Sequence, residues 1–348
     1  MFSGIDGSVE ILVSLSVELT AGRDSRMFLS ELTEADIVKT TLIIINKVAV
    51  IAVKRDKRLA DPRADIIPPR PPPPPKPRPS LSEPCKSTKI TKMADFGYDS
   101  SKTGFNFGTT FEQYEDVYFS PSISSYFESL KTNASATKKL KQQEGNYFDV
   151  DFGYSLIKDK RDQVFQTTEG YRISFNQSLP LYSENRAILN GFDYVTFYPF
   201  NENVIGSVRF FSRAINSISD GGDVKISDRM YIPSKLIRGF EPGKIGPVDS
   251  GDFVGGNYAA ALGFTAALPN LLPAFSNMDI SVFLDTANVW GVDYDDTIDD
   301  ASKIRSAFGV SANWFTPAGP LNFSLSQDLS SLDTDRTESF RFNIGTTF

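Results

Sequence analysis

The stretch "FRFNIGTTF", Phe340 to Phe348, ends the chain and decides how the rest of it is interpreted. Residues on one parity are mostly apolar, and residues on the other parity are polar, charged or small. Because successive side chains of a strand point to opposite faces, this pattern predicts a β-strand with one apolar face. The apolar parity is Phe340, Phe342, Ile344, Thr346 and Phe348, and the other is Arg341, Asn343, Gly345 and Thr347.

The same alternation recurs upstream, and between Phe96 and Phe348 it predicts about twelve strands. In each of them, one parity is apolar or aromatic and the other is small, polar or charged. Representative stretches are "NYFDVDFGYSL" (Asn146 to Leu156), "GYRISFNQS" (Gly170 to Ser178), "DISVFLDTA" (Asp279 to Ala287), "AFGVSANWF" (Ala307 to Phe315) and "GPLNFSLSQ" (Gly319 to Gln327).

Two all-β folds have such strands: a soluble sandwich and a transmembrane barrel. The predicted strands are about ten to fourteen residues long, whereas strands of soluble proteins average about five or six. Short connections at Pro199 to Asn203 and Thr316 to Pro320 alternate with long ones at Ser217 to Gly256 and Gly291 to Lys303. Outer-membrane barrels have this alternation, and aromatic girdles near strand ends. The sequence therefore predicts an antiparallel transmembrane β-barrel, with girdle residues Tyr198, Phe200, Trp290, Trp314 and Phe315.

Composition excludes several kinds of site. The chain has no histidine and one cysteine, Cys85, which excludes Ser-His-Asp triads, histidine-bound zinc and an intramolecular disulfide. The formal net charge of −7 argues against nucleic acid as a partner, because phosphate binding needs a basic face. We expect no enzyme, no metal and no cofactor. The acidic stretch "DYDDTIDD", Asp293 to Asp300, lacks the spacing of a calcium loop, so we expect a solvated loop there.

Residues 1–92 differ from residues 93–348 in composition and in hydrophobic periodicity. "IIPPRPPPPPKPRPS", Ile66 to Ser80, is a proline-rich run that can form neither a helix nor an inner strand. The longest apolar stretch, Thr41 to Val53, is too short for a transmembrane helix and contains Lys47. No signal-peptide pattern stands at the beginning of the chain. We predict a disordered leader over 1–92, with a linker at 66–80, and a barrel domain over 93–348.

The long connection carries the motif that identifies a family. "IRGF" comprises Ile237, Arg238, Gly239 and Phe240, and "VGGN" includes Gly255, Gly256 and Asn257. With "FLDTANVW" (Phe283 to Trp290), "WFTPAGPLNFSLS" (Trp314 to Ser326) and the final strand, these blocks resemble, in order and spacing, the C-terminal barrel of the BamA family, a bacterial surface antigen family. The alphaproteobacterial branch is the most similar.

The resemblance implies a sixteen-stranded barrel that assembles other barrels in the outer membrane without ATP. It also implies that the sixth extracellular loop folds into the lumen, where its arginine, here Arg238, meets an aspartate of the wall. Asp285 has the parity opposite to Ile280, Val282 and Leu284, so it points inward if those residues face lipid. A second acidic partner, which relatives often have, aligns with Thr265 and is therefore not expected here.

The resemblance gives the final strand two roles. A terminal aromatic, here Phe348, resembles the β-signal that the assembly machinery recognises. In the BamA family the last strand also closes weakly on the first, forming a lateral gate, and Gly345 corresponds to its kink glycine. We therefore expect β-signal and gate residues at Phe340, Phe342, Ile344, Gly345 and Phe348.

Family strands one to four and the periplasmic POTRA domains are not found in the sequence, so we expect about twelve of sixteen strands, as in a truncated or chimeric fragment. The expected partners are outer-membrane lipid, nascent barrel clients and accessory lipoproteins of an assembly complex. Two alternatives stay open: a two-partner secretion or translocation-assembly transporter, and a passive porin or structural barrel.

Overall fold

The computed structural model describes residues 80–81, 85–93, 96–134, 136–164, 166–201, 203–219, 221–269, 271, 278–298, 303–316 and 319–344. Side-chain positions are described from Phe96 onward. The predictions for residues 1–79, which make up most of the leader and nearly all of the proline-rich run, and for Gly345 and Phe348 therefore lie outside the described residues.

One antiparallel sheet of thirteen strands dominates the described chain. Its strands are β1 (Ser80–Leu81), β2 (Cys85–Met93), β3 (Tyr98–Tyr114), β4 (Val117–Thr132), β5 (Gly145–Asp159), β6 (Gly170–Tyr182), β7 (Ala187–Asn201), β8 (Val204–Ser217), β11 (Tyr258–Leu268), β12 (Met278–Trp290), β13 (Arg305–Thr316), β14 (Gly319–Ser330) and β15 (Phe340–Ile344). Small elements complete the fold: helix α4 (Lys138–Lys141), the 3-10 helix η3 (Ile226–Asp228), and the ribbon of β9 (Val248–Asp249) and β10 (Asp252–Phe253).

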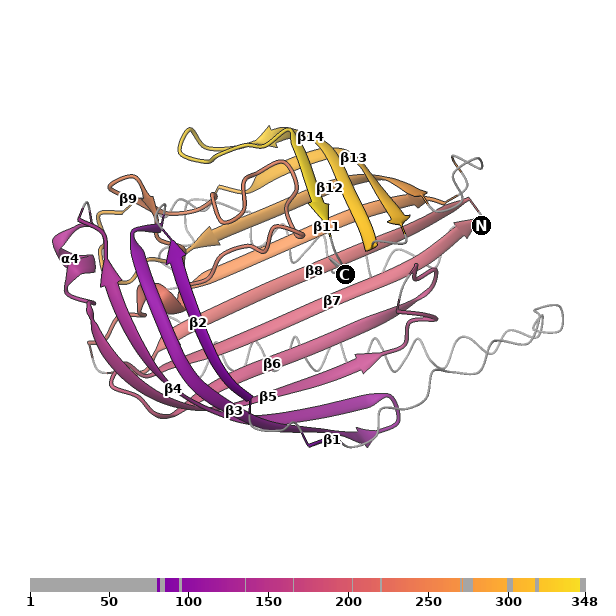
Figure 1. Cartoon of the computed structure of the whole chain (residues 1–348). Coiled ribbons are helices and arrows are strands. Elements are labelled where there is room, and N and C mark those ends of the chain that lie inside the picture. Colours follow the sequence, from indigo (N-terminus) through magenta and orange to yellow (C-terminus); the bar gives the residue numbers. More distant parts are fainter. Residues whose placement is uncertain are drawn as a thin grey trace, which may run out of the picture. The chain divides into compact units, whose positions relative to one another are not determined.

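The strands pair in chain order from β3 to β8, then through β11 to β15, while β1 and β2 both pair with β3. Within the described residues, β2 and β15 do not pair with each other, so the wall is not closed. Figure 1 shows long, tilted strands following one another around this curved wall. The predicted all-β antiparallel barrel, incomplete in its strands, is confirmed. The sheet begins with β1 and β2, on the N-terminal side of the predicted boundary at Met93.

The two faces of the wall differ as the sequence predicts. On β12, Val282 and Leu284 are 45% and 37% exposed, whereas Phe283 and Asp285 are 5% and 2% exposed. On β15, Phe340, Phe342 and Ile344 are exposed and Arg341 is buried. An apolar face exposed over so many strands is what a barrel presents to hydrocarbon. The described residues include no helix long and apolar enough to cross a membrane.

Several connections at one end of the strands are short. Only two residues separate β3 from β4, β7 from β8, and β13 from β14, as antiparallel neighbours permit. At the other end, residues 133–144, 218–257 and 291–304 form long connections. The connection 218–257, between β8 and β11, is called the lumen loop below.

Candidate functional site

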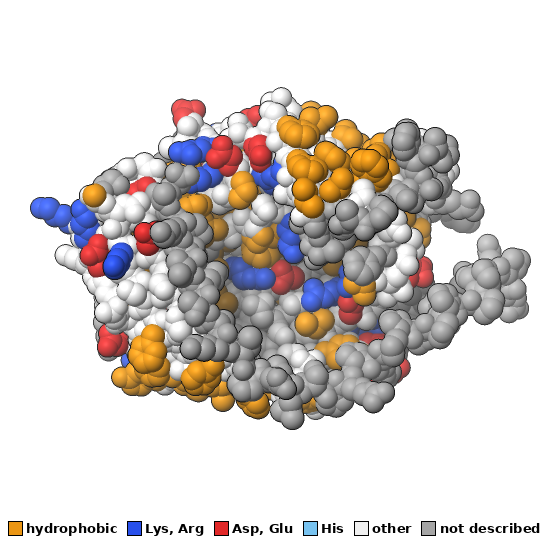
Figure 2. Space-filling model, in the orientation of Figure 1, with side chains coloured by type: hydrophobic (Ala, Val, Ile, Leu, Met, Phe, Trp, Pro, Cys, Tyr) orange, Lys and Arg blue, Asp and Glu red, His pale blue; other side chains and the backbone are white. Residues whose placement is uncertain are grey.

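The lumen loop is buried against the inner face of the wall. Loops normally run over a protein surface, where water can solvate their backbone. Here Val224, Ile226, Phe240 and Val254 have no exposed side-chain surface, and Ile232 is 2% exposed. In Figure 2, charged side chains gather near the centre of the view, while hydrophobic ones lie toward its upper right and lower edge. Because these side chains are buried, the lumen loop packs as an inner layer against the wall.

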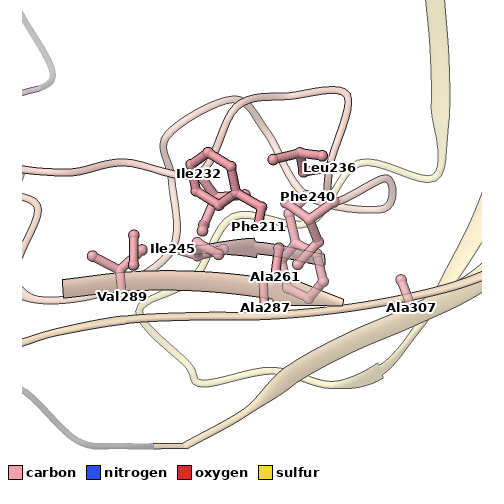
Figure 3. Close-up of a cluster of buried hydrophobic side chains, with 11 residues drawn as sticks. Phe211, Ile232, Leu236, Phe240, Ile245, Ala261, Ala287, Val289 and Ala307 are labelled. Atoms are coloured by element: carbon pink, nitrogen blue, oxygen red, sulfur yellow. The ribbon is translucent and has the colours of Figure 1, made fainter. Parts of the chain in front are cut away.

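Apolar side chains of the loop and of the wall pack together in a cluster. Ile232, Leu236 and Phe240 of the loop pack with Ala261 of β11 and with alanines and a valine of the neighbouring strands. Figure 3 shows the loop side chains lying over the small side chains of these strands. Alanines on the inner face leave room for the bulky loop residues. Complete burial of a phenylalanine contributes on the order of 1.5–3 kcal/mol, so Phe240 is a major apolar anchor of the loop.

The structure brings Arg238 and Asp285 together. Arg238 Nε lies 2.7 Å from one carboxylate oxygen of Asp285, and Nη2 lies 2.8 Å from the other. The backbone N–H of Arg238 donates a third hydrogen bond, 3.0 Å long, to Oδ2. The Asp285 side chain is 3% exposed. This paired, fork-to-fork geometry is the strongest that a guanidinium makes with a carboxylate.

Three neighbours complete the surroundings of Arg238. Nη1 donates to Ser311 Oγ at 3.2 Å, and Nη2 donates to Thr265 Oγ1 at 3.3 Å. The guanidinium carbon lies 3.5 Å from the centre of the Phe283 ring, a cation–π arrangement. Thr265 thus stands where relatives were expected to have a carboxylate, and here a hydroxyl accepts the hydrogen bond. Asp285 is therefore the single carboxylate that hydrogen-bonds Arg238 among the described residues.

Glycine is required between Arg238 and Phe240. Gly239 has φ +91°, a region that side chains other than glycine rarely adopt. A Cβ on Gly239 would lie 2.6 Å from the Cβ of Ala307 on β13. The turn at Gly239 lets Arg238 reach the wall while Phe240 enters the apolar cluster. Ile237, beside Arg238, is 3% exposed.

The glycines and the asparagine predicted at the start of a strand end the lumen loop just before β11. A Cβ on Gly256 would lie 2.3 Å from the Trp290 carbonyl oxygen, so only glycine fits there. Gly255 has φ +67°. Asn257 is buried, and its side-chain amide donates to Asp293 at 2.9 Å. This motif therefore shapes the exit of the loop and lies outside the Arg238 cluster.

Asp293 has a larger role than the predicted solvated loop gave it. It accepts from the backbone N–H of Val224 at 2.9 Å and pairs with Arg229, whose side chain is fully buried. Next to it, Tyr294 is 7% exposed and donates to Asp249 at 2.9 Å. The prediction of a solvated loop is wrong for Tyr294, which is buried, whereas Asp293 is exposed as predicted and also binds the lumen loop.

A second charged anchor joins the lumen loop to the opposite part of the wall. Lys225, 2% exposed at its side chain, lies 3.1 Å from Glu128 of β4, 2.8 Å from Asp149 of β5 and 3.3 Å from Asp228 of η3. Lys102 of β3 also pairs with Asp228, at 2.9 Å. This cluster was not predicted from the sequence. The available signal was Asp149, a carboxylate on the polar parity of a strand whose other parity is largely aromatic.

The terminal strand reaches the lumen loop through Arg341, which sequence analysis also missed. Arg341 donates to the backbone carbonyls of Ser234, at 2.7 Å, and Phe240. Its Nε lies 2.8 Å from Glu338. On the outer face, the rings of Phe342 and Phe323 stack with centroids 4.9 Å apart. The outer side of β15 thus has the apolar surface expected of it.

Fold and site together define an antiparallel outer-membrane-type barrel wall with a loop folded into its lumen. The chain belongs to the Omp85 superfamily, because the model of the Omp85 superfamily domain matches residues 77–348. The predicted resemblance to the BamA family is confirmed by the comparisons with individual proteins.

One relative is the outer membrane protein assembly factor BamA of Neisseria meningitidis serogroup B, 27% identical over an alignment of 141 residues that covers 32% of this chain and 17% of the relative. Among solved structures, BamA from Haemophilus ducreyi lacking POTRA domains 1–3 superposes with a TM-score of 0.65 and 20% identity. That superposition covers 74% of this chain and 56% of the other. CdiB from Acinetobacter baumannii gives a TM-score of 0.46 and 15% identity, over 71% of this chain and 42% of the other. The chain thus spans about half or less of each of these proteins.

Proposed function

We propose that this chain forms the barrel of a BamA-like insertase, located in the cell outer membrane. Its substrates are nascent outer-membrane β-barrel proteins, and its surroundings are outer-membrane lipid and accessory lipoproteins of an assembly complex. It acts without a catalytic site, a metal or ATP. The observation that carries the proposal is the lumen loop, held by Arg238 on Asp285 inside a wall of the Omp85 type.

The lateral-gate mechanism follows from the edges of the sheet. An edge strand offers a row of unpaired N–H and C=O groups, and a further strand can add to it. In lipid, an unpaired backbone group costs several kcal/mol, so a client strand gains strongly by pairing. Phe340, Phe342 and Ile344 give β15 the lipid-facing side that such an edge needs. Gly345 and Phe348 belong to this proposal as the kink and the terminal aromatic.

The lumen loop also bears on the alternatives. A passive porin conducts through an open, polar lumen, whereas here the loop lies on the inner wall and is held by apolar and ionic contacts. This occupancy favours a gated barrel over a porin. A two-partner secretion transporter has the same general architecture, and its function differs in that the client crosses the membrane instead of entering it.

The proposal is tested with the purified full chain in proteoliposomes. A urea-unfolded eight-stranded outer-membrane barrel is added, and its folding is followed by heat-resistant gel mobility. We expect faster folding of the client than in empty liposomes or in liposomes containing a heat-inactivated chain. An unfolded secreted exoprotein, offered in parallel, should stay outside. If the folded chain leaves the client rate unchanged, the insertase proposal is wrong. If it carries the exoprotein inside, the secretion alternative holds.

A further inference from the structure

Arg341 lies on the inner face of β15 and is 7% exposed. Its Nε donates to Glu338, 2.8 Å away, just before the strand begins. A guanidinium has five N–H donors in a planar fork, so this one ion pair leaves the two terminal nitrogens available. Both of them point away from the sheet and into the lumen loop.

The terminal nitrogens of Arg341 donate to backbone carbonyls that flank Arg238 on both sides. Nη1 lies 2.7 Å from the carbonyl oxygen of Ser234 and 3.5 Å from that of Ile237. Nη2 donates to the carbonyl of Phe240. Buried carbonyls without a donor are costly, and donors that carry a charge make the stronger hydrogen bonds. Arg341 therefore supplies hydrogen-bond donors to the backbone carbonyls of the turn that positions Arg238 against Asp285.

The backbone of the same loop segment is paired with the connection between β14 and β15. Glu338 N–H donates to the Gly239 carbonyl at 3.0 Å, and Glu241 N–H donates to the Arg336 carbonyl at 2.9 Å. Arg336 N–H in turn donates to Lys244 at 3.1 Å. The segment is thus held between two places on the wall, with Asp285 of β12 on one side and the end of the terminal hairpin on the other.

We propose that Arg341 is a positioning residue that couples the terminal strand to the lumen loop. A displacement of β15, as in gate opening, withdraws the guanidinium from the Ser234 and Phe240 carbonyls and frees the turn that holds Arg238. In its gating role this inference rests on the proposed function, while the coupling itself is a property of the folded chain. Lysine replaces arginine incompletely, because one ammonium cannot reach Glu338 and separated carbonyls with the same fork geometry.

The test is hydrogen exchange of the full chain folded in detergent micelles, with Arg341→Gln and Arg341→Lys variants. We expect the amides of Arg238, Glu241 and Glu338 to exchange at least tenfold faster in Arg341→Gln, and by an intermediate factor in Arg341→Lys. Amides of β5 to β8 should keep their protection. Arg341→Lys still carries a charge at this position, so it supplies the measurement where Arg341→Gln does not fold.

Arg172→Gln is the matched control, since Arg172 is an arginine of the inner-facing parity on β6, 3.8 Å from Asp159. This variant should leave the exchange rates of the Arg238, Glu241 and Glu338 amides unchanged. Unchanged exchange of those amides in both Arg341 variants would overturn the coupling, and so would equal acceleration in Arg172→Gln. Client insertion by the unmodified chain tests the proposed function separately, because the coupling is measured without any client.

Discussion

The guanidinium of Arg238 lies on the carboxylate of Asp285 with two nearly parallel hydrogen bonds, 2.7 and 2.8 Å long, and joins the lumen loop to a residue of β12 that follows 47 positions later. The pair is largely removed from water, since the Arg238 and Asp285 side chains are 20% and 3% exposed. Breaking a buried pair costs more than the pair contributes, because the remaining charge loses its partner.

Arg238→Ala should therefore destabilise the folded chain by about 3–5 kcal/mol, since Asp285 then keeps a charge without a cation. Asp285→Asn should cost a similar amount, and the double variant should cost less than the sum. The measurement is the midpoint of heat-dependent gel mobility. Arg336→Ala is the control, because its side chain is 49% exposed and 4.0 Å from Glu241. Unchanged mobility in both single variants would show that the pair does not hold the loop.

Gly239→Ala separates crowding from backbone strain. Gly239 has φ +91° and Gly251 has φ +94°, but a Cβ on Gly239 would lie 2.6 Å from the Ala307 Cβ, whereas nothing lies within 4 Å at Gly251. Gly251→Ala should cost about 1–2 kcal/mol from the left-handed conformation. Gly239→Ala should cost clearly more, and Ala307→Gly should recover part of the difference. Equal costs for both glycines, measured by the same midpoints, would argue against the close packing of the loop on β13.

The cluster around Lys225 predicts a pH range for loop docking. Burial opposes charge on Asp228, but the ammonium groups of Lys102 and Lys225 hold the pKa of Asp228 below its ordinary value. Its contribution is thus fully present above about pH 4 and is lost as pH falls through the lowered pKa. Burial likewise opposes charge on Lys225, but Asp228 and Glu128 raise its pKa. That contribution is complete below about pH 10.4 and is lost as pH rises through the raised pKa.

Lys225→Met tests this range. Without the ammonium, Glu128 and Asp149 face each other while buried, and the cost at pH 7 should be about 3–5 kcal/mol. The cost should shrink as pH falls below about 4, because Asp228, whose pKa Lys102 and Lys225 lower, then loses the charge that Lys225 pairs with in the unmodified chain. Lys139→Met is the control, since its side chain is 51% exposed and pairs with Asp295 at 3.0 Å. A Lys225→Met penalty that stays unchanged as pH falls below about 4 would contradict the assigned cause.

Deletion of Phe348 tests the terminal β-signal. We expect slower insertion of the chain itself into liposomes that contain an assembly machinery, because the terminal aromatic is what that machinery is proposed to recognise. Internal aromatic substitution, Phe175→Leu on β6, should have little effect. Equal insertion rates for the truncated and intact chains, read from protease-resistant material, would remove the β-signal from the account.

The contact between Arg238 and Asp285 could be predicted from the sequence, because the parity of β12 places Asp285 on the inner face and the resemblance of the IRGF motif to the BamA family implies that Arg238 meets an aspartate of the wall. The long strands from β3 onward were predictable from their alternating polarity, whereas β1 and β2 were not, because they lie within the leader that was predicted to be disordered. Even Thr265 was placed on the correct strand, and its hydroxyl takes the position where an acidic partner was considered.

The contacts of Arg341 and Lys225 were not predictable in this way. Arg341 binds backbone carbonyls about a hundred positions earlier, and backbone acceptors have no sequence signature. Lys225 meets Glu128 and Asp149 because the loop crosses to β4 and β5, a path that no local pattern encodes. Asp293 shows the same limitation, since an acidic stretch predicts solvation but gives no sign of the buried arginine, Arg229, that Asp293 pairs with.

The most direct test of the insertase account is site-specific photocrosslinking from the edge strand during client insertion. A photoreactive residue at Phe342 or Ile344 of β15 is compared with one at Val310 of β13, which is also exposed on the outer face but lies inside the sheet. We predict adducts between the client's terminal strand and the β15 positions, appearing before the client becomes heat-resistant, and none at Val310. Adducts of equal yield at all three positions, or at none while the client folds, would contradict the account.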